Sequence, residues 1–240
     1  SLRALLNAPP PPAGPGGYDF ARDAFFEGVG SVGFSLSPPK TASLAKPPWR
    51  LRATLAANAA RWRLAEDIVA VMGPDTGGLA AAMVTGQEVF VPQAQVLEMR
   101  AAGLSHIISI SGLHMAIVGG FVFAGVRLAV SAWPWLALRI PGKKAAALAG
   151  LTAVSAYLVL SGAPPPAQRA AITASVAFLA ILADRRALSL HGLAVAAMIV
   201  LMIQPEAVTE PGFQMSFAAT TSLIALAEIW PRPAREIQVP

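Results

Sequence analysis

The sequence predicts a mainly α fold: a polytopic helical membrane domain of about five membrane segments, some of which could be broken or re-entrant, preceded by an amphipathic helical region. Of its 240 residues, 55% are hydrophobic and only 13% are charged, with a mean hydropathy of +0.58. A soluble domain carries about 25% charged residues. The deficit is concentrated: residues 1–103 hold nine basic and eight acidic side chains, whereas residues 104–230 hold seven and four, nearly all between apolar runs. This clustering favours membrane spans over one very apolar globule.

The first residues predict a linker. Residues 1–17 are rich in proline and glycine, which is typical of an extended segment leaving an upstream domain. The chain begins at Ser1 without a methionine and stops at Pro240 in a Pro-containing run, so we expect a fragment of a longer protein. Residues 18–34 are compatible with one short amphipathic helix and a turn.

Residues 18–103 are expected to form an extracytoplasmic or interfacial helical region. Its best helix is predicted at residues 49–72, where an apolar stripe recurs every three or four residues, at Leu51, Leu55, Ala59, Trp62, Ala65, Val69 and Met72. Basic residues flank the stripe, which suits a helix lying in a membrane interface, although a solvated helix packed on its own domain is equally compatible. A second, short helix is expected at residues 92–102.

Five apolar segments follow, against the roughly 20 helical residues that cross a hydrocarbon core. They are residues 104–130, 145–160, 170–183, 187–203 and 212–229. The second and third are short for full spans and could instead form one re-entrant hairpin. Residues 231–240 would begin the next loop.

Loop charges predict the orientation. Eight basic residues fall on one side of the predicted spans, namely Arg127, Arg139, Lys143, Lys144, Arg185, Arg186, Arg232 and Arg235. The other side has only Arg169, with Glu206 and Glu210. Basic loops stay in the cytoplasm, so residues 1–103 are predicted on the outer face of the membrane, which is the periplasmic side in a Gram-negative cell.

Polar residues inside the spans are candidate functional groups, because unpaired polar groups are costly in a bilayer. The first predicted span contains two pairs at i, i+3 spacing, His106 with Ser109 and Ser111 with His114. Alternatively, the serines bond to their own helix and the histidines lie near the interface. Prolines 164–166 predict a break just before Arg169, and a third polar group opens the last span at Gln214 and Ser216.

Three segments resemble the successive signatures of the competence domain of ComEC proteins. They read LSHIISISGLHMAIV (residues 104–118), LSGAPPPAQRAAI (160–172) and QPEAVTEPGFQMSFAA (204–219). Upstream, YDFARDAFFEGVG (18–30) and AAMVTGQEVFVPQAQVLEMRAAGLSHI (81–107) resemble the same family, so the similarity extends from residue 18 to about residue 226.

The resemblance implies a multi-pass bacterial inner-membrane protein that forms a channel for single-stranded DNA during natural transformation, together with other DNA-uptake proteins. It also implies an OB-fold-like domain before this chain and, in many members, a metallo-β-lactamase-like domain after it. The motif positions carried over are Ser111, Gly112, Leu113, His114, Gly162, Arg169, Gly212, Phe213, Gln214 and Ser216. We expect no cofactor, and with no cysteine the chain has no thiolate ligand or nucleophile.

A physical hypothesis for the DNA path follows, because single strands need positive and polar surfaces with aromatic faces. Basic residues of the outer region could gather phosphates, or else lipid headgroups: Lys40, Lys46, Arg50, Arg52, Arg61 and Arg63. Arg169 would meet the strand at the channel mouth, with Ser111, His114 and Gln214 lining a constriction.

Two other classes compete with a channel. A small-solute transporter explains the proline and glycine breaks. A rhomboid-like intramembrane serine protease would use Ser111 as nucleophile and His191 as base, but rhomboids have glycine where this chain has Ser109, and the other motifs would be unexplained. We therefore expect a non-enzymatic protein.

Overall fold

The computed structural model describes residues 3–26, 28–38, 40, 47–104, 106 and 108–229, and the side chain of Arg50 is outside this description. Two compact units divide the chain, residues 1–52 and 53–240, and each is described by itself. The predicted phosphate contact at Lys46 and the predicted loop from residue 231 lie outside the described residues.

The first unit contains a two-stranded sheet that the sequence pattern did not reveal. Strand β1 (Ala4–Asn7) pairs antiparallel with β2 (Val32–Ser35), and Ala4 lies opposite Ser35. Helix α1 (Phe20–Phe26) lies between them in the chain and confirms the predicted short helix. Strand β1 does not alternate between apolar and polar residues, and the alternation in β2 covers only four residues, which is too short a signal to predict a strand.

Helix α2 (Trp49–Met72) has the predicted bounds, and α4 (Gln93–Ala101) confirms the predicted short helix. Between them lie α3 (Pro74–Thr85), which was not predicted, and the 3₁₀ turn η1 (Glu88–Phe90). Proline at the first position starts α3, and Gly86, in the left-handed conformation at φ 73°, ends it. The second unit buries Ala65 of α2, while Leu55, Trp62 and Met72 of the predicted stripe are exposed.

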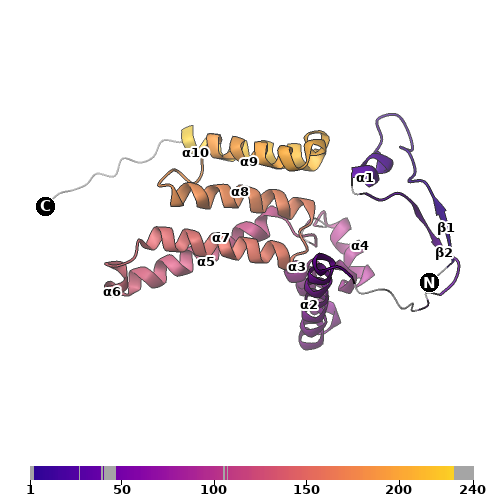
Figure 1. The fold of residues 1–240 in the computed structure, drawn as a ribbon, viewed down its shortest axis with the longest axis horizontal. Coiled ribbons are helices and arrows are strands. Elements are labelled where there is room, and N and C mark those ends of the chain that lie inside the picture. Colours follow the sequence, from indigo (N-terminus) through magenta and orange to yellow (C-terminus); the bar gives the residue numbers. More distant parts are fainter. Residues whose placement is uncertain are drawn as a thin grey trace. The chain divides into compact units, whose positions relative to one another are not determined.

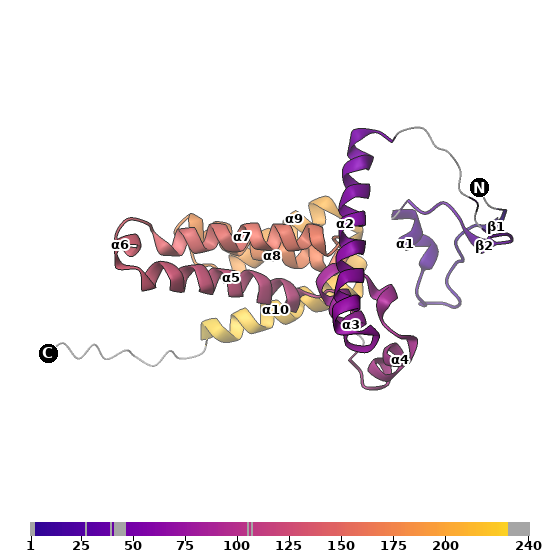
Figure 2. The ribbon, with the colours of Figure 1, turned by 90° about the horizontal axis from the view of Figure 1, so that it is seen from below.

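Five helices run alongside one another in the second unit, with α2, α3 and α4 at one end (Figures 1 and 2). They are α5 (Gly112–Ala132), α7 (Gly142–Leu160), α8 (Pro165–Leu182), α9 (Leu190–Ile203) and α10 (Pro211–Ile229). The short helix α6 (Pro134–Ala137) joins α5 to α7, and the 3₁₀ turn η3 (Pro205–Thr209) joins α9 to α10.

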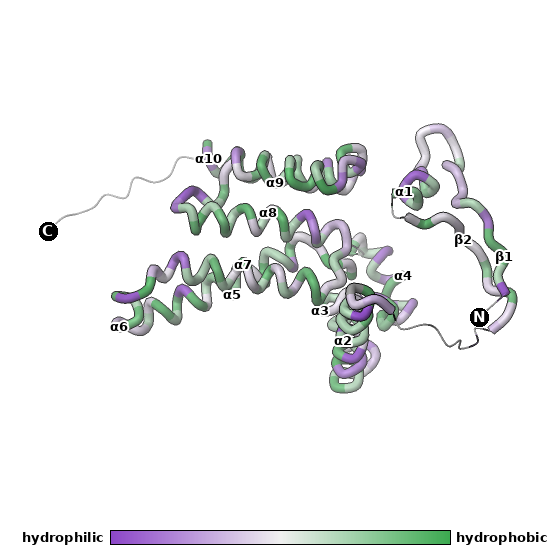
Figure 3. The backbone as a smooth tube through the Cα atoms, in the orientation of Figure 1, coloured by the Kyte–Doolittle hydropathy of each residue, from purple (hydrophilic) through white to green (hydrophobic). Residues whose placement is uncertain are grey.

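Helices α5, α7 and α8 are long and apolar enough to cross a membrane, and α9 is a shorter apolar helix. Apolar residues run along them, while hydrophilic residues gather at their ends and loops (Figure 3). The prediction that the second and third segments are short was wrong, because α7 already begins at Gly142 and α8 takes prolines into its first turn. The first segment was predicted to be continuous from residue 104, but α5 begins only at Gly112.

The core of this unit lies between α5, α7 and α8. Ile110, Met115 and Val154 are almost completely buried there, and the ring of Phe178 packs against the backbone of Gly119 and Gly150. A Cβ at Gly150 would lie 2.6 Å from that ring, so glycine is what allows these helices to approach.

The α5–α7 connection and the α8–α9 loop, which contain basic residues, lie at one end of the helices, as the charge pattern predicted. Lys144 at the start of α7 forms an ion pair with Asp184 after α8, with 2.7 Å between Nζ and Oδ2. The ends of α7 and α9 and the starts of α5, α8 and α10 therefore lie at the other end.

Candidate functional site between α5, α8 and α10

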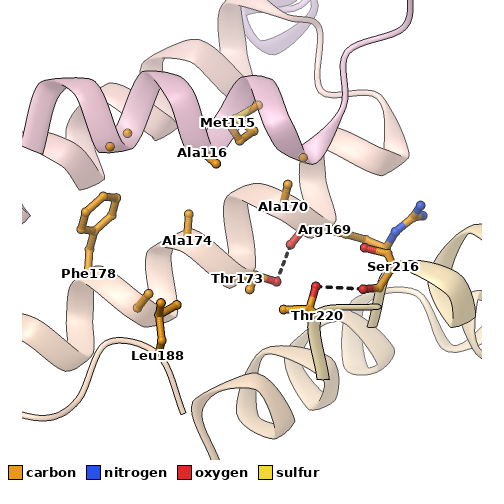
Figure 4. Close-up of a pocket in the computed structure, with 14 residues that line it drawn as sticks. Met115, Ala116, Arg169, Ala170, Thr173, Ala174, Phe178, Leu188, Ser216 and Thr220 are labelled. Atoms are coloured by element: carbon orange, nitrogen blue, oxygen red, sulfur yellow. Dashed lines mark hydrogen bonds between the residues drawn. The ribbon is translucent and has the colours of Figure 1, made fainter. Parts of the chain in front are cut away.

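The three motif segments meet at one pocket. Its volume is about 550 Å³, and its walls come from α5, α8, α10 and Leu188 of the α8–α9 loop. Each of the three motifs contributes to this lining, the first through Gly112, the second through Arg169 and the third through Ser216. Polar side chains gather at one end of the pocket, and Phe178 and Leu188 lie at the other (Figure 4).

Ser111 and His114 cap α5. The Ser111 side chain accepts from the backbone N–H of His114, and the Ser111 backbone N–H donates to His114 Nδ1 at 3.2 Å. This is a capping box with histidine in the usual place of glutamate. The predicted pairing of Ser111 with His114 is therefore confirmed, whereas His106 and Ser109 precede α5 and share no helical turn.

Arg169 lies in the first turns of α8 and is 7% exposed. Its Nη1 lies 3.5 Å from Oε2 of Glu210, and its Nε is buried without a hydrogen-bond partner among the described residues. Gly212, in the first turn of α10, leaves room for the guanidinium, because a Cβ there would lie 3.1 Å from Nη2. Two predicted motif residues are thus explained by one contact.

Hydroxyl groups form the rest of the polar lining. Thr173 donates to the Arg169 carbonyl at 2.9 Å, and Thr220 donates to the Ser216 carbonyl at 2.9 Å (Figure 4). Each hydroxyl oxygen keeps lone pairs that can accept from a ligand. The sequence did not identify Thr173, Thr220 or Glu210 as site residues. A signal for Glu210 was present, because it lies on the same side of the predicted spans as Arg169, the single basic residue on that side in residues 104–230.

Seven of the ten motif residues do not line the pocket, and three of these seven have environments of their own. Leu113 is 65% exposed on α5, and Phe213 is buried in a second core, with its ring centroid 4.5 Å from that of Phe217. The Gln214 side chain donates to the Val208 carbonyl at 3.0 Å. The predicted constriction of Ser111, His114 and Gln214 does not coincide with this pocket, because none of the three residues lines it. Ser111 and His114 instead cap the start of α5, where the neighbouring Gly112 lines the pocket.

A second arginine, Arg61 of α2, caps two other helices. Its Nε and Nη2 donate to the carbonyl groups of Thr85, Leu160 and Ser161 at 2.7–3.1 Å, and its Nη1 donates to Asn58. These carbonyls belong to the ends of α3 and α7, where helices lack internal partners. Partial burial lowers the pKa of Arg61 from its ordinary value.

Gly162 is the motif residue that makes room for Arg61. It adopts φ 79°, in the left-handed region, and a Cβ there would overlap the Arg61 guanidinium. Arg61 was predicted to contact phosphate or lipid, but each of its three guanidinium nitrogens already donates to a group within the protein.

The other predicted basic residues occupy different environments. Lys40 and Arg52 are exposed in the first unit, and Arg63 is exposed on α2 in the second.

The Ser111–His191 pair that a rhomboid-like protease needs is not formed. Gly112, next to Ser111, faces Ala170 near the start of α8, whereas His191 borders a groove with Ala183 and Arg185 at the far end of α8. The helix rise of about 1.5 Å per residue separates these two levels by roughly 20 Å. Among the described residues, no group of three or more His, Cys, Asp or Glu side chains could hold a metal ion.

Comparison with known proteins identifies the family. The model of the family described as "Competence protein" matches residues 83–239. The chain belongs to this competence protein family. It is also 27% identical over 161 residues to ComE operon protein 3 of Bacillus subtilis (strain 168), a match that covers 67% of this chain and 19% of that protein. The chain thus spans about a fifth of that relative, and no solved structure matched it.

Membership of this competence family confirms the resemblance derived from the three motifs, and it agrees with a helical membrane protein. The matched region includes all five long helices from α5 to α10 and every residue of the Arg169 pocket. The pocket is therefore a feature of the competence domain itself.

Proposed function

We propose that this chain is part of an inner-membrane channel through which single-stranded DNA enters the cytoplasm during natural transformation. One observation carries the proposal: the three motifs of the competence domain meet around a pocket that contains a buried, incompletely paired arginine. The role is a conducting one, with no catalysis and no cofactor.

The chemistry of the pocket supports a nucleic-acid path. A polyanionic strand requires cationic and polar groups, and its bases stack on aromatic rings. The pocket lining combines these groups: the cation of Arg169, the hydroxyls of Thr173, Ser216 and Thr220, and the ring of Phe178. Gly119 and Gly120 of α5 line the same pocket. Nonspecific conduction also requires weak contacts, which apolar and hydroxyl surfaces supply.

The orientation belongs to the same proposal. The loop basic residues at the Lys144–Asp184 end would face the cytoplasm, and residues 1–103 would lie in the periplasm. The exposed apolar side chains of α5 would face the lipid bilayer or further segments of the full protein. Other DNA-uptake proteins, and OB-fold-like and metallo-β-lactamase-like domains of the full chain, are the proposed partners.

Uptake of labelled DNA into the cytoplasm tests the channel. Full-length protein with Ser111→Ala, His114→Ala or Arg169→Glu would be compared with wild type, with expression matched by immunoblot and periplasmic DNA counted separately. Arg127→Glu, at an exposed arginine outside the pocket, is the matched control. We expect periplasmic DNA to accumulate and cytoplasmic entry to collapse with Arg169→Glu.

Unchanged entry after deletion of the gene would overturn the proposal. A small-solute transporter would then become the leading alternative.

A further inference from the structure

Arg169 lies where a cation is poorly stabilised by the protein alone. It is 7% exposed, its Nε has no partner among the described residues, and it lies near the start of α8, where the helix dipole is positive. The first turns of α5 and α10, at Gly112 and Gly212, add two further positive helix ends close to it. Burying such a charge is costly unless an anion offsets it.

Glu210 provides this anion only in part. Its Oε2 lies 3.5 Å from Nη1 of Arg169, longer than the 2.7–2.9 Å of a strong charge-assisted hydrogen bond, and its side chain is 39% exposed. Its backbone carbonyl accepts from Phe213 and Gln214, which holds the main chain at the start of α10. The carboxylate can therefore rotate toward solvent while the helix start stays in place.

We propose that Arg169 binds one phosphodiester group of the DNA strand at a time, and that Glu210 is the counter-ion that this phosphate displaces. The inference rests on the proposed channel function and adds a discrete binding step to it. The guanidinium offers a planar fork that matches two phosphate oxygens. Gly212 lacks a side chain that would crowd the guanidinium. The adjoining volume of about 550 Å³, which Gly112 also lines, accepts sugar and base.

The surrounding hydroxyls favour a nucleotide over a phospholipid. Thr173 lies one helical turn after Arg169 on α8, and Ser216 and Thr220 line the same pocket from α10. The hydroxyl oxygens of these residues can accept from N–H groups of the bases. An acyl chain below a lipid headgroup would gain nothing from these hydroxyls. Return of Glu210 to Arg169 would release the phosphate, so the strand is not held permanently.

Binding of a fluorescent 20-mer oligothymidylate to the full-length protein in phosphatidylcholine nanodiscs tests this step. Arg169→Gln is expected to weaken binding roughly tenfold, because one charge-assisted contact is lost. It should also reduce the slope of log K against log salt by about 0.7, the value for one phosphate on a single strand. Glu210→Gln removes the competing anion and is expected to strengthen binding several-fold.

The opposite signs of the two variants separate binding from stability, because loss of a purely structural ion pair would weaken both proteins alike. Arg169→Lys keeps the charge and provides a folded variant if Arg169→Gln does not assemble, with weaker binding expected from the lost fork. Arg127→Gln is the control for a simple change in net charge, and a methylphosphonate oligonucleotide should not distinguish Arg169→Gln from wild type.

If Arg169→Gln and Glu210→Gln both bind DNA with the affinity and salt slope of the wild-type protein, the inference is overturned while the channel function stands. Phosphatidylglycerol bound to wild type but not to Arg169→Gln, with DNA binding unchanged, would also overturn it and assign the site to a lipid. Absence of DNA binding by wild type, together with normal uptake after gene deletion, would instead overturn the channel function on which the inference rests.

Discussion

Two arginines of the second unit carry the same guanidinium group but differ in how many hydrogen-bond acceptors the protein provides for it. Arg61 donates to three backbone carbonyls and one side-chain amide, and it holds α2 against the ends of α3 and α7. Among the described residues, Arg169 has one long ion pair and its Nε has no hydrogen-bond partner, although it is the more deeply buried of the two arginines. A motif glycine makes room for each guanidinium, Gly162 for Arg61 and Gly212 for Arg169.

The difference separates a structural group from a candidate binding group. Fully paired polar groups make an arrangement rigid, whereas an incompletely paired buried charge is stabilised by a ligand. Basic residues near a predicted channel are therefore not equivalent, and the number of their internal acceptors distinguishes them better than their charge does.

Gly162→Ala is expected to have the largest effect on stability. The new Cβ would overlap the Arg61 guanidinium and force a non-glycine residue to φ 79°, which by itself costs about 1–2 kcal/mol. Thermal unfolding of the detergent-solubilised protein measures the loss. In an Arg61→Ala background the same substitution should cost much less, because the overlap is gone, whereas additive costs would contradict the contact. Gly120→Ala is the matched control, because a Cβ there would have no atom of the described residues within 4 Å.

Arg61→Ala should be the next most damaging change. It leaves the carbonyls of Thr85, Leu160 and Ser161 without this donor, and we expect a loss of about 2–4 kcal/mol in the free energy of unfolding. Arg63→Ala, at an exposed arginine of the same helix, should change it by less than about 0.5 kcal/mol. Equal effects of the two substitutions would show that the Arg61 contacts contribute little.

Arg169→Gln should destabilise the protein less than Arg61→Ala, by about 1 kcal/mol or less, because it removes an incompletely paired charge and leaves Glu210 partly in solvent. Cytoplasmic DNA entry should nevertheless fall sharply at matched protein levels. A loss of stability as large as that of Arg61→Ala would break the comparison and make Arg169 a structural residue.

The smallest effect is expected at His114. His114→Leu removes the acceptor for the Ser111 N–H and should cost about 0.5 kcal/mol, while His114→Gln can preserve the capping box. Comparison of DNA entry in the two variants distinguishes capping from a direct role. If His114→Gln keeps stability but loses entry, the imidazole itself is required on the path.

Several features followed from the sequence alone because their causes are local. Hydropathy over 20 residues predicted membrane helices, the spacing of apolar residues predicted α2, and the i, i+3 spacing predicted the pairing of Ser111 with His114. The three motifs were sufficient to identify the family. The charge pattern also predicted that the loops containing Lys144 and Asp184 share one end.

Only the tertiary structure decided which polar groups are satisfied. Arg61 meets carbonyls 24 to 100 residues away, and Arg169 meets Glu210 across a loop and a helix, so no local pattern distinguishes the two arginines. The same holds for Gly162 and Gly212, because a side chain at either position would crowd a guanidinium group that comes from another helix. Hydropathy and spacing act along one segment, whereas the pairing of a buried charge depends on which segments pack around it.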